Sequence, residues 1–263
     1  MVRAHRLSEI LSLLATQDRI SVDEIVTRFA VSAATARRDL DTLSEQRLVR
    51  RTHGGAARLS GSFDLPLLYK DRHQSEAKRA IARRAAQLIM PGMTIGLTGG
   101  TTVAALGATI ATAHDGDLDG DGSPLTIMTN AINIAATLVL RPQIRIVVPG
   151  GVVHSRSFEL TGPFALETLR HVSLDLAFIG VNAFDPQHGA MVHDDDEAQV
   201  NRMMAERAAS AFILADSSKI GQRALARIGG QGLFTGIITD DRIRPDHRRA
   251  IEDAGLTVHL APL

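Results

Sequence analysis

Hydrophobic residues recur at the spacing of an amphipathic helix three times within the first 45 residues of the chain. The first run covers residues 4–16. Ser21 and Glu24 form a capping-box pattern in front of the second run, and Ser32 stands where the cap of a third helix belongs. The apolar positions of the third run are Ala36, Leu40 and Leu43. The pattern predicts three short helices that share a small core.

A short hairpin is expected directly after these helices. Residues 48–51 form a candidate strand, His53 to Ala56 form a tight turn with two glycines, and a second strand runs through Arg58. Three helices followed by a hairpin is the order of a winged helix-turn-helix, and we assign residues 1–59 to such a domain. Residues 60–74 mix Gly, Ser and Pro with a few apolar positions, which is typical of a linker.

From residue 75 onward, helices alternate with short strands that are apolar on both faces. Helices are expected over 75–90, from Thr102, from Ala131, over 197–208 and from Pro245. Strands are expected at 93–97, 125–129, 144–148, 174–181, 211–216, 236–240 and 256–260. Such strands belong to a mostly parallel sheet covered on both sides. We therefore assign residues 75–263 to a larger α/β domain.

The charge distribution distinguishes the two domains. There are 10 Lys and Arg against 7 Asp and Glu before residue 60, and 19 against 22 after it. A basic small domain beside a mildly acidic larger one is expected of a polyanion binder that carries a sensor or an enzyme. The absence of cysteine excludes disulfides and cysteine-ligated metals. Since no apolar run approaches the roughly 20 residues of a membrane helix and no signal-peptide core is visible, we expect a cytoplasmic protein without a membrane partner.

The third helix and the hairpin carry the residues expected to meet double-stranded DNA. The core positions of the helix leave its polar and basic side chains outside, where a recognition helix reads base edges in the major groove. Arginines flank the hairpin, where they can lie along phosphates, and its glycines allow close backbone approach. The alternative is a solvated helix that merely carries arginines. The predicted DNA-binding residues are Ser32, Ala33, Thr35, Arg37, Arg38, Arg50, Arg51, His53, Gly54, Gly55 and Arg58.

Small and polar residues follow the strands of the larger domain. Residues 99–102 form a glycine-rich turn at the start of a helix, where free N–H groups and the helix dipole suit a phosphate. The turn lacks the lysine of a Walker A loop, so it does not indicate nucleotide hydrolysis, and a plain tight connection is the alternative. Other residues that follow strands, at the edge where open α/β sheets bind ligands, are Asn130, Gly150, Gly151, Gly180, Asn182 and Lys219.

The N-terminal stretch resembles the DeoR family of bacterial transcriptional regulators. The resemblance rests on Val31-Ser32, on Thr35 with Arg37–Leu40, and on His53–Ala56. Ala36 stands where the family usually has a larger aliphatic residue. The larger domain is similar to the sensor domain of that family, from "AKRAIARRAAQLI" through "PGG", "AFIGV" and "LADSSK" to "ITD".

The resemblance implies a transcriptional regulator, usually a repressor of a carbohydrate-metabolism operon. Its operator affinity would change when a phosphorylated sugar or related metabolite binds the sensor domain. A homodimer is expected because helix-turn-helix proteins usually span two half-sites, and the family also allows a homotetramer.

The sensor domain of this family is similar in turn to ribose-5-phosphate isomerase, which raises a sugar-phosphate isomerase as the enzyme alternative. The isomerase uses an Asp-Gly-Ala-Asp stretch, a Glu base and an Asp-x-Ser-Lys element. This chain keeps Glu197 and Asp216-x-Ser218-Lys219, but residues 180–183 read Gly-Val-Asn-Ala. We therefore expect binding without turnover and no catalytic residues. The implied effector-binding residues are Thr98, Gly99, Gly100, Thr101, Thr102, Asn130, Gly150, Gly151, Gly180, Asn182, Asp194, Glu197 and Lys219.

Two departures from the family fall in this predicted site. Thr98 and Gly99 replace a common Asp-Ser, and Asn201 stands where a Lys is common. The loss of an acid and a base from one rim indicates an altered or weaker effector. It also leaves open a constitutive DNA binder whose effector pocket has decayed.

Two patterns resemble metal sites without completing one. Residues 115–126 have the spacing of an EF-hand, but Thr126 replaces the final Glu and a strand is expected where an EF-hand has a helix. His188, His193 and the acidic run 194–197 lack a complete ligand spacing. We expect no metal and no cofactor.

Overall fold

The computed structural model describes residues 3–46, 48–58, 75–113 and 124–263, and the chain divides into two compact units, residues 1–73 and 74–263. The predicted linker, residues 60–74, lies entirely outside the described residues. Each unit is described here by itself.

The first unit contains the three predicted helices: α1 (Arg3–Thr16), α2 (Val22–Phe29) and α3 (Ala33–Glu45). Their apolar faces form one core, in which Ala36, Leu40 and Leu43 are fully buried. Ser21 and Glu24 make the complete capping box at the start of α2. Ser32 caps α3 by accepting a hydrogen bond from the N–H of Thr35. The helix caps predicted from the sequence for α2 and α3 are therefore confirmed.

A three-stranded antiparallel sheet completes this unit, in the order β1-β3-β2. The predicted hairpin is β2 (Arg50–Thr52) and β3 (Gly55–Ala57), and β1 (Arg19–Ser21) was not predicted because three residues carry too little pattern. β1 pairs with β3 so closely that a Cβ atom on Gly55 would lie 1.9 Å from the carbonyl oxygen of Ile20. Gly55 is thus required by packing within the unit.

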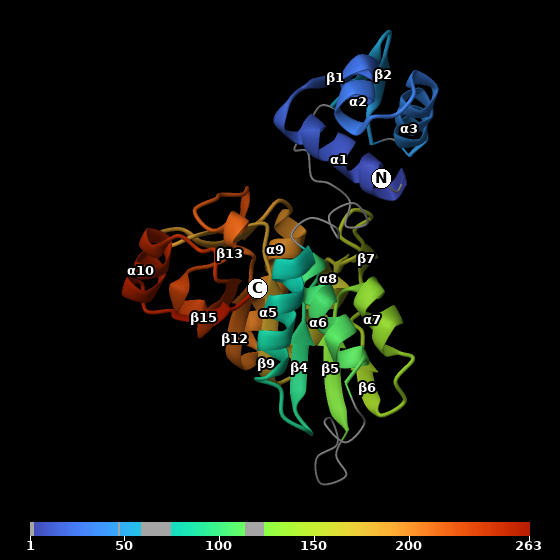
Figure 1. Ribbon diagram of the computed structural model, residues 1–263. Coiled ribbons are helices and arrows are strands. Elements are labelled where there is room, and N and C mark those ends of the chain that lie inside the picture. The colour runs from blue at the N-terminus through green and yellow to red at the C-terminus, as the bar shows by residue number, and fades with distance from the viewer. Residues whose placement is uncertain (1–2, 47, 59–74, 114–123) are drawn as a thin grey trace. The chain divides into compact units, whose positions relative to one another are not determined.

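The second unit is built on a seven-stranded sheet in the order β15-β14-β12-β9-β4-β5-β6, in which every neighbouring pair is parallel (Figure 1). This confirms the predicted fold class, and each strand falls on a predicted one. The strands are β4 (Thr94–Leu97), β5 (Leu125–Thr129), β6 (Ile144–Val147), β9 (Leu174–Gly180), β12 (Ala208–Leu214), β14 (Gly236–Asp240) and β15 (Thr257–Ala261).

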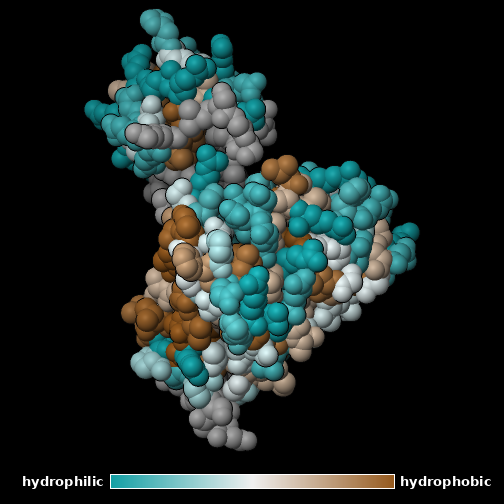
Figure 2. Space-filling view, turned by 180° about the vertical axis from the view of Figure 1, so that it is seen from behind, coloured by the Kyte–Doolittle hydropathy of each residue, from teal (hydrophilic) through white to brown (hydrophobic). Residues whose placement is uncertain are grey.

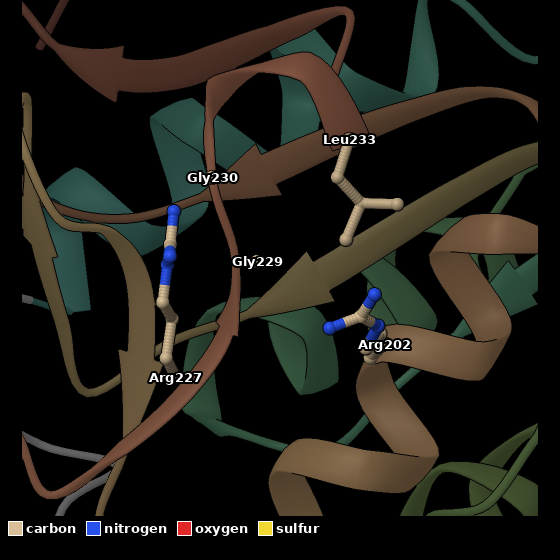
Figure 3. Close-up of a pocket in the computed structure, with 5 residues that line it drawn as sticks. All are labelled: Arg202, Arg227, Gly229, Gly230 and Leu233. Atoms are coloured by element: carbon tan, nitrogen blue, oxygen red, sulfur yellow. The ribbon is translucent and has the colours of Figure 1, made fainter.

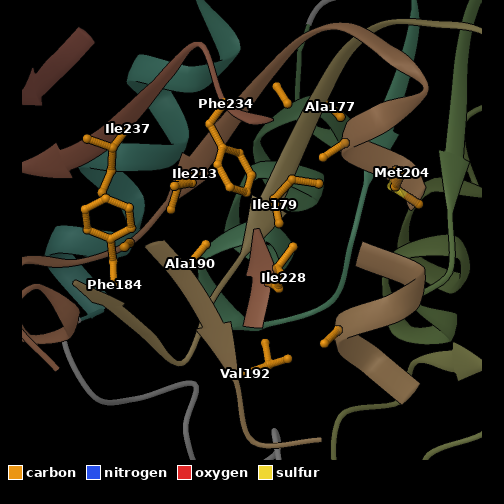
Figure 4. Packing of buried hydrophobic residues seen from close by; sticks show 14 of the residues in the cluster. Ala177, Ile179, Phe184, Ala190, Val192, Met204, Ile213, Ile228, Phe234 and Ile237 are labelled. Atoms are coloured by element: carbon orange, nitrogen blue, oxygen red, sulfur yellow. The ribbon is translucent and has the colours of Figure 1, made fainter. Parts of the chain in front are cut away.

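Helices cover both faces of this sheet, and each face has its own hydrophobic cluster. The helices α5 (Ser75–Ala86), α6 (Thr101–Ala111) and α7 (Ile132–Leu138) contribute to one cluster; α8 (Pro163–Arg170), α9 (Asp195–Glu206) and α10 (Pro245–Asp253) contribute to the other, part of which Figure 4 shows. Within β9, Phe178 enters the first cluster and Ile179 the second. This alternation explains why the strands read as apolar on both faces.

The structure corrects several predicted boundaries. The helix predicted to reach residue 90 ends at Ala86, because Leu88 and Ile89 donate to residues three positions back in a turn before Pro91. The helix predicted over 197–208 begins and ends two residues earlier, since Ala208 starts β12. Short strands outside the main sheet escaped prediction: β7 (Val152–Val153), β8 (Leu160–Thr161), β10 (Ala183–Asp185), β11 (Gly189–Val192) and β13 (Ala226–Gly229).

Helix α8 also escaped prediction, although Pro163 at its first position is a helix-start signal.

Candidate functional site

The outer face of α3 presents two arginines. Arg37 and Arg38 are both exposed. Ser32 caps the helix and its hydroxyl lies 2.9 Å from that of Thr35, so both hydroxyls are engaged at the start of α3. The arrangement leaves the arginines as the available cationic groups of this helix.

The arginines of the wing differ from one another. Arg51 donates to the carbonyl of Gly55 and pairs with Asp41 of α3 at 2.9 Å, and Arg58 pairs with Asp18 at 3.3 Å. Arg50 and His53 are exposed. Arg51 therefore anchors the wing to α3, whereas Arg50 and His53 extend from it.

A buried ion pair holds α3 against α1, and sequence reasoning missed it. Asp39 is 1% exposed and lies 2.5 Å from Nε of Arg6, which is itself buried, while Nε of Arg3 lies 3.4 Å away. A buried carboxylate requires such partners. Asp39, the acidic residue of the "RRDL" motif, thus serves to hold α3 against α1 in this chain.

In the second unit, the order of strands changes direction between β4 and β9. The chain leaves β4 for β5 and β6 on one side, and returns to β9 on the other side of β4. The carboxyl ends at such a switch point form the ligand-binding crevice of open α/β sheets. Here the N–H of Gly180 donates to the hydroxyl of Thr98 at 2.8 Å, so the structure joins two of the predicted effector residues.

Glu159 occupies the space beside Gly99, and sequence reasoning did not single it out. A Cβ atom on Gly99 would lie 2.3 Å from Oε1 of Glu159, and one on Gly180 would lie 2.2 Å from the carbonyl oxygen of Gly99. Glu159 is 4% exposed and accepts a hydrogen bond from the Asn130 amide at 2.9 Å. Gly99, which has no side chain, therefore makes room for this carboxyl group.

A second carboxyl group, Glu197 of α9, is also buried and interacts with Glu159. Burial, followed by the charge of Glu197, raises the pKa of Glu159 to about 8, while donors from Asn130, the Gly99 N–H and Asn201 oppose that rise. Two close carboxyl groups in a low-dielectric site cannot both ionise easily. The pair therefore holds a proton near neutral pH.

His154 closes this cluster toward solvent. Its Nδ1 lies 2.7 Å from Oε1 of Glu197 and 3.0 Å from the hydroxyl of Ser157, and its Nε2 lies 3.8 Å from Oδ2 of Asp194. The side chain is 31% exposed, whereas that of Glu197 is 6% exposed. Asp194 also caps α9 by accepting from the N–H of Glu197.

Two buried amides lie next to the carboxyl groups. Asn201 is 1% exposed and its side chain hydrogen-bonds to Glu159, while its Oδ1 accepts no hydrogen bond of standard geometry from a described residue. The same holds for Oδ1 of Asn130, which is fully buried. We name Asn130, His154, Glu159, Asp194, Glu197 and Asn201 the carboxyl cluster.

Other predicted effector residues have different local roles. Asn182 accepts a hydrogen bond from the N–H of His193 and so shapes the segment before α9. Gly151 has a φ of 146°, and a Cβ atom there would lie 2.7 Å from the carbonyl oxygen of Thr161 in β8. Gly150 is near Phe164.

Lys219 lies in the short 3-10 turn Ser217–Lys219 after β12. Asp216 caps this turn by accepting from the N–H of Ser218, and Asp240 accepts from the N–H of Ser217 at 2.7 Å. Burial tends to raise the pKa of Asp240, but hydrogen bonds from Ser217 and Arg242 outweigh it and lower the pKa. The Asp-x-Ser-Lys element is therefore a turn held by hydrogen bonds to two carboxylates.

The two metal-like patterns are not assembled into sites in the described part of the chain. Residues 114–123 of the EF-hand-like stretch lie outside the described residues. His188 pairs with Asp185 at 2.9 Å, and no group of three or more His, Asp or Glu within the described ranges could hold a metal ion.

A separate pocket of about 270 Å³ lies beside β13. Arg202, Arg227, Gly229, Gly230 and Leu233 line it, as Figure 3 shows. Arg202 pairs with Glu206 at 2.8 Å. None of the predicted effector residues lines this pocket.

Comparison with known proteins decides the family. A model of the DeoR-like helix-turn-helix domain matches residues 6–61, and a model of the DeoR C terminal sensor domain matches residues 73–241. The chain belongs to the DeoR family. The predicted resemblance is thereby confirmed for both parts of the chain, and the winged helix-turn-helix and the α/β sheet are the two domain types of this family.

Full-length relatives agree with this assignment. The glycerol-3-phosphate regulon repressor of Escherichia coli is 32% identical over 240 residues, covering 91% of this chain and 92% of the relative. The HTH-type transcriptional regulator GlpR of Haloferax volcanii is 32% identical over 260 residues, covering 98% of both chains. The putative aga operon transcriptional repressor of Escherichia coli O157:H7 is 29% identical over 260 residues, covering 98% of this chain and 93% of the relative.

Solved structures align less closely. Ribose 5-phosphate isomerase A from Methanocaldococcus jannaschii covers 55% of this chain and 54% of its own, at 17% identity and a TM-score of 0.41. The family assignment rests on the sequence matches. No helix in the described ranges is long and apolar enough to cross a membrane.

Proposed function

We propose that this DeoR-family chain is a repressor of a carbohydrate-metabolism operon, whose affinity for operator DNA changes when a phosphorylated sugar or related metabolite binds its sensor domain. The observation that carries the proposal is the capped helix α3, with Arg37 and Arg38 exposed opposite its buried face. The printed names of the relatives, which include a glycerol-3-phosphate regulon repressor and an aga operon repressor, support the carbohydrate assignment.

In the proposed complex, α3 lies in the major groove and the wing lies along the backbone. Arginine makes bidentate contacts to guanine, and Arg37 and Arg38 stand in the first two turns of α3, where recognition helices contact bases. Arg50 and His53 of the wing would contact phosphates. Arg51 would act indirectly, through its bonds to Asp41 and the Gly55 carbonyl.

The effector would bind at the switch point between β4 and β9. Its phosphate would lie at the start of α6, where Gly100 caps the helix without a side-chain hydrogen bond, so backbone N–H groups are available to an anion. Its hydroxyl groups would approach Asn182 and Asp194, and Lys219 would pair with the phosphate. An effector changes the operator affinity only by the difference in its affinity for the DNA-competent and DNA-incompetent arrangements.

A second copy of the chain would supply the other half-site contact. One side of the sensor unit carries a band of hydrophobic surface, seen in Figure 2. Exposed apolar patches of this kind mark interaction surfaces, and helix-turn-helix proteins bind two half-sites as dimers. The exposed apolar residues around the edge strand β6 are Ile132, Val139, Leu140, Val148, Val152, Val153 and Phe164.

Fluorescence anisotropy on labelled DNA from the upstream region of the gene tests the proposal. Salt is held constant because phosphate contacts make affinity salt-dependent. Arg37→Ala should weaken binding by about 1 to 3 kcal/mol, while Arg249→Ala, which removes an exposed arginine of α10, should have little effect. Equal loss in both variants would contradict the assignment of α3.

The effector part of the proposal is tested in the same assay with a panel of sugar phosphates and free sugars. One metabolite should change the operator affinity of the wild type, and Lys219→Ala should abolish that response while DNA binding persists. An unchanged response in Lys219→Ala would place the phosphate elsewhere. No response to any member of the panel would favour a constitutive DNA binder.

A further inference from the structure

The imidazole of His154 lies among carboxyl groups that come from two different elements. Glu197 and Asp194 stand at the start of α9, and Glu159 comes from the segment that leads into β8. The imidazole contacts the buried Glu197 directly at 2.7 Å and remains partly exposed itself. It therefore covers the buried carboxyl group of Glu197.

The backbone that carries His154 is unusual. Phe158 has a φ of 63°, the left-handed region that non-glycine residues rarely adopt, and its N–H donates to the carbonyl of His154 at 2.9 Å. Residues held in this region cluster at ligand-binding and switch segments. The tight turn 154–159 places His154 and Glu159 on the same cluster, although it connects only the two-residue strands β7 and β8.

Two buried amides add acceptor oxygens that lack partners. Oδ1 of Asn130 and Oδ1 of Asn201 are buried, and neither accepts a standard hydrogen bond from a described residue. Buried polar atoms are rarely left in this state, because each costs about 1 to 3 kcal/mol. Asn201 lies beside Glu159, where its hydrogen bonding opposes the rise of the Glu159 pKa. Both unsatisfied acceptors therefore belong to amides that hydrogen-bond to Glu159 within the carboxyl cluster.

We propose that the carboxyl cluster binds the protonated amine of the effector in the place that His154 now occupies, and that the effector is an amino-sugar phosphate. This inference rests on the proposed function, since it names the class of ligand that the sensor domain takes. A primary ammonium has three donors and one positive charge. Glu197, Asp194 and the free acceptor of an asparagine match those donors.

The charges explain the preference over a sugar phosphate without nitrogen. The Asn201 amide that hydrogen-bonds to Glu159 is neutral, so the positive charge is left to the ligand. The contacts of Glu159 among the described residues are amide and N–H donors, none of which is a cation. An ammonium makes charge-assisted hydrogen bonds to the carboxylates, which a hydroxyl group at the same position cannot make.

Isothermal titration calorimetry of the full-length protein tests this inference with matched ligands. Glucosamine 6-phosphate and galactosamine 6-phosphate are each compared with the parent hexose 6-phosphate and with the N-acetyl derivative, which keeps the nitrogen but loses its charge. At least one amine should bind at least about tenfold more tightly than both of its neutral counterparts. This factor lies near the lower end of the range that a hydrogen bond to a charged group contributes.

Two variants localise the effect. The ratio of amine to parent affinity should fall to below about threefold in Glu197→Gln, and Asp194→Asn should lower it less, because Asp194 is more exposed. His154→Ala should raise the affinity for the amine, since the occupant of the site is removed. Thermal unfolding of each variant establishes that it is folded.

The outcomes separate this inference from the proposed function. If the parent hexose phosphates bind as tightly as the amines, or if the amine preference survives Glu197→Gln, the inference is wrong although the regulator can still respond to a sugar phosphate. Lower amine affinity in His154→Ala would show that the imidazole is a ligand contact and would also contradict it. Failure of the wild type to bind operator DNA in the anisotropy assay would instead contradict the proposed function.

Discussion

Glu159→Gln should remove a loss of folding stability that the sensor domain suffers as the pH rises. The raised pKa of Glu159 means that the folded state binds the proton more tightly than the unfolded state, in which the ordinary value is 4.5. Stability from this group is fully present below pH 4.5 and is lost as the pH rises through about 8. The gap between the two values corresponds to a loss of up to about 5 kcal/mol. Glutamine keeps the shape and an acceptor for Asn130 without this titration.

Urea unfolding followed by far-ultraviolet circular dichroism measures this effect, since the sequence has no Trp and only one Tyr. At pH 5 the wild type and the variant should differ little. Between pH 5 and pH 9 the variant should gain about 4 kcal/mol relative to the wild type, a shift of the midpoint of roughly 2 M urea.

Glu252→Gln is the matched control, because Glu252 forms an exposed pair with Arg248 on α10. Its midpoint should follow that of the wild type at every pH. If Glu159→Gln instead loses stability as the pH rises, or if its midpoint also runs parallel to that of the wild type, Glu159 is not the protonated member of a buried pair and the electrostatic reasoning fails.

Three further predictions concern the other parts of the molecule. Gly55→Ala should destabilise the first unit in thermal unfolding, because its Cβ atom would collide with the backbone of β1, whereas Gly54→Ala, with open space around it, should be tolerated; equal stability would mean that β1 and β3 are not so closely paired. Asp39→Ala should cost about 3 to 5 kcal/mol because it leaves the buried Arg6 without its partner, and a urea midpoint like that of the exposed Asp41→Asn would contradict this. Phe164→Asp should shift the protein toward monomer in light scattering and weaken operator binding, and an unchanged mass would remove Phe164 from the interface.

Local sequence signals were sufficient where the determining interaction lies within a few residues. Ser21 with Glu24 is a capping box that is complete within four positions, and apolar positions spaced by three and four residues define the buried face of α3. The strands of the main sheet were equally visible because burial on both faces excludes polar residues from them. Short strands such as β1 and β7 could not be recognised in the sequence, because two or three residues are too few to show an alternation of apolar and polar positions.

The candidate site was predictable only in part. The glycine-rich turn, Asn130, Asp194 and Glu197 could be named because they follow strands or begin a helix, and strand ends converge at one edge of the sheet. Glu159 and His154 could not, because their importance depends on contacts with residues that lie far away in the sequence. A signal did exist in the Thr98-Gly99 departure, but a missing side chain does not reveal which residue fills its space.

By itself, the sequence determined the two domains, their fold classes and the family, because these depend on periodicity, caps and motifs that are local in the chain. The tertiary structure alone decided that Asp39 pairs with Arg6, that Gly55 is required by packing, and that Gly99 accommodates Glu159. These relations arise from distances between segments that are remote in sequence. The charge state of the carboxyl cluster belongs with them, because burial and the approach of Glu197 exist only once the chain has folded.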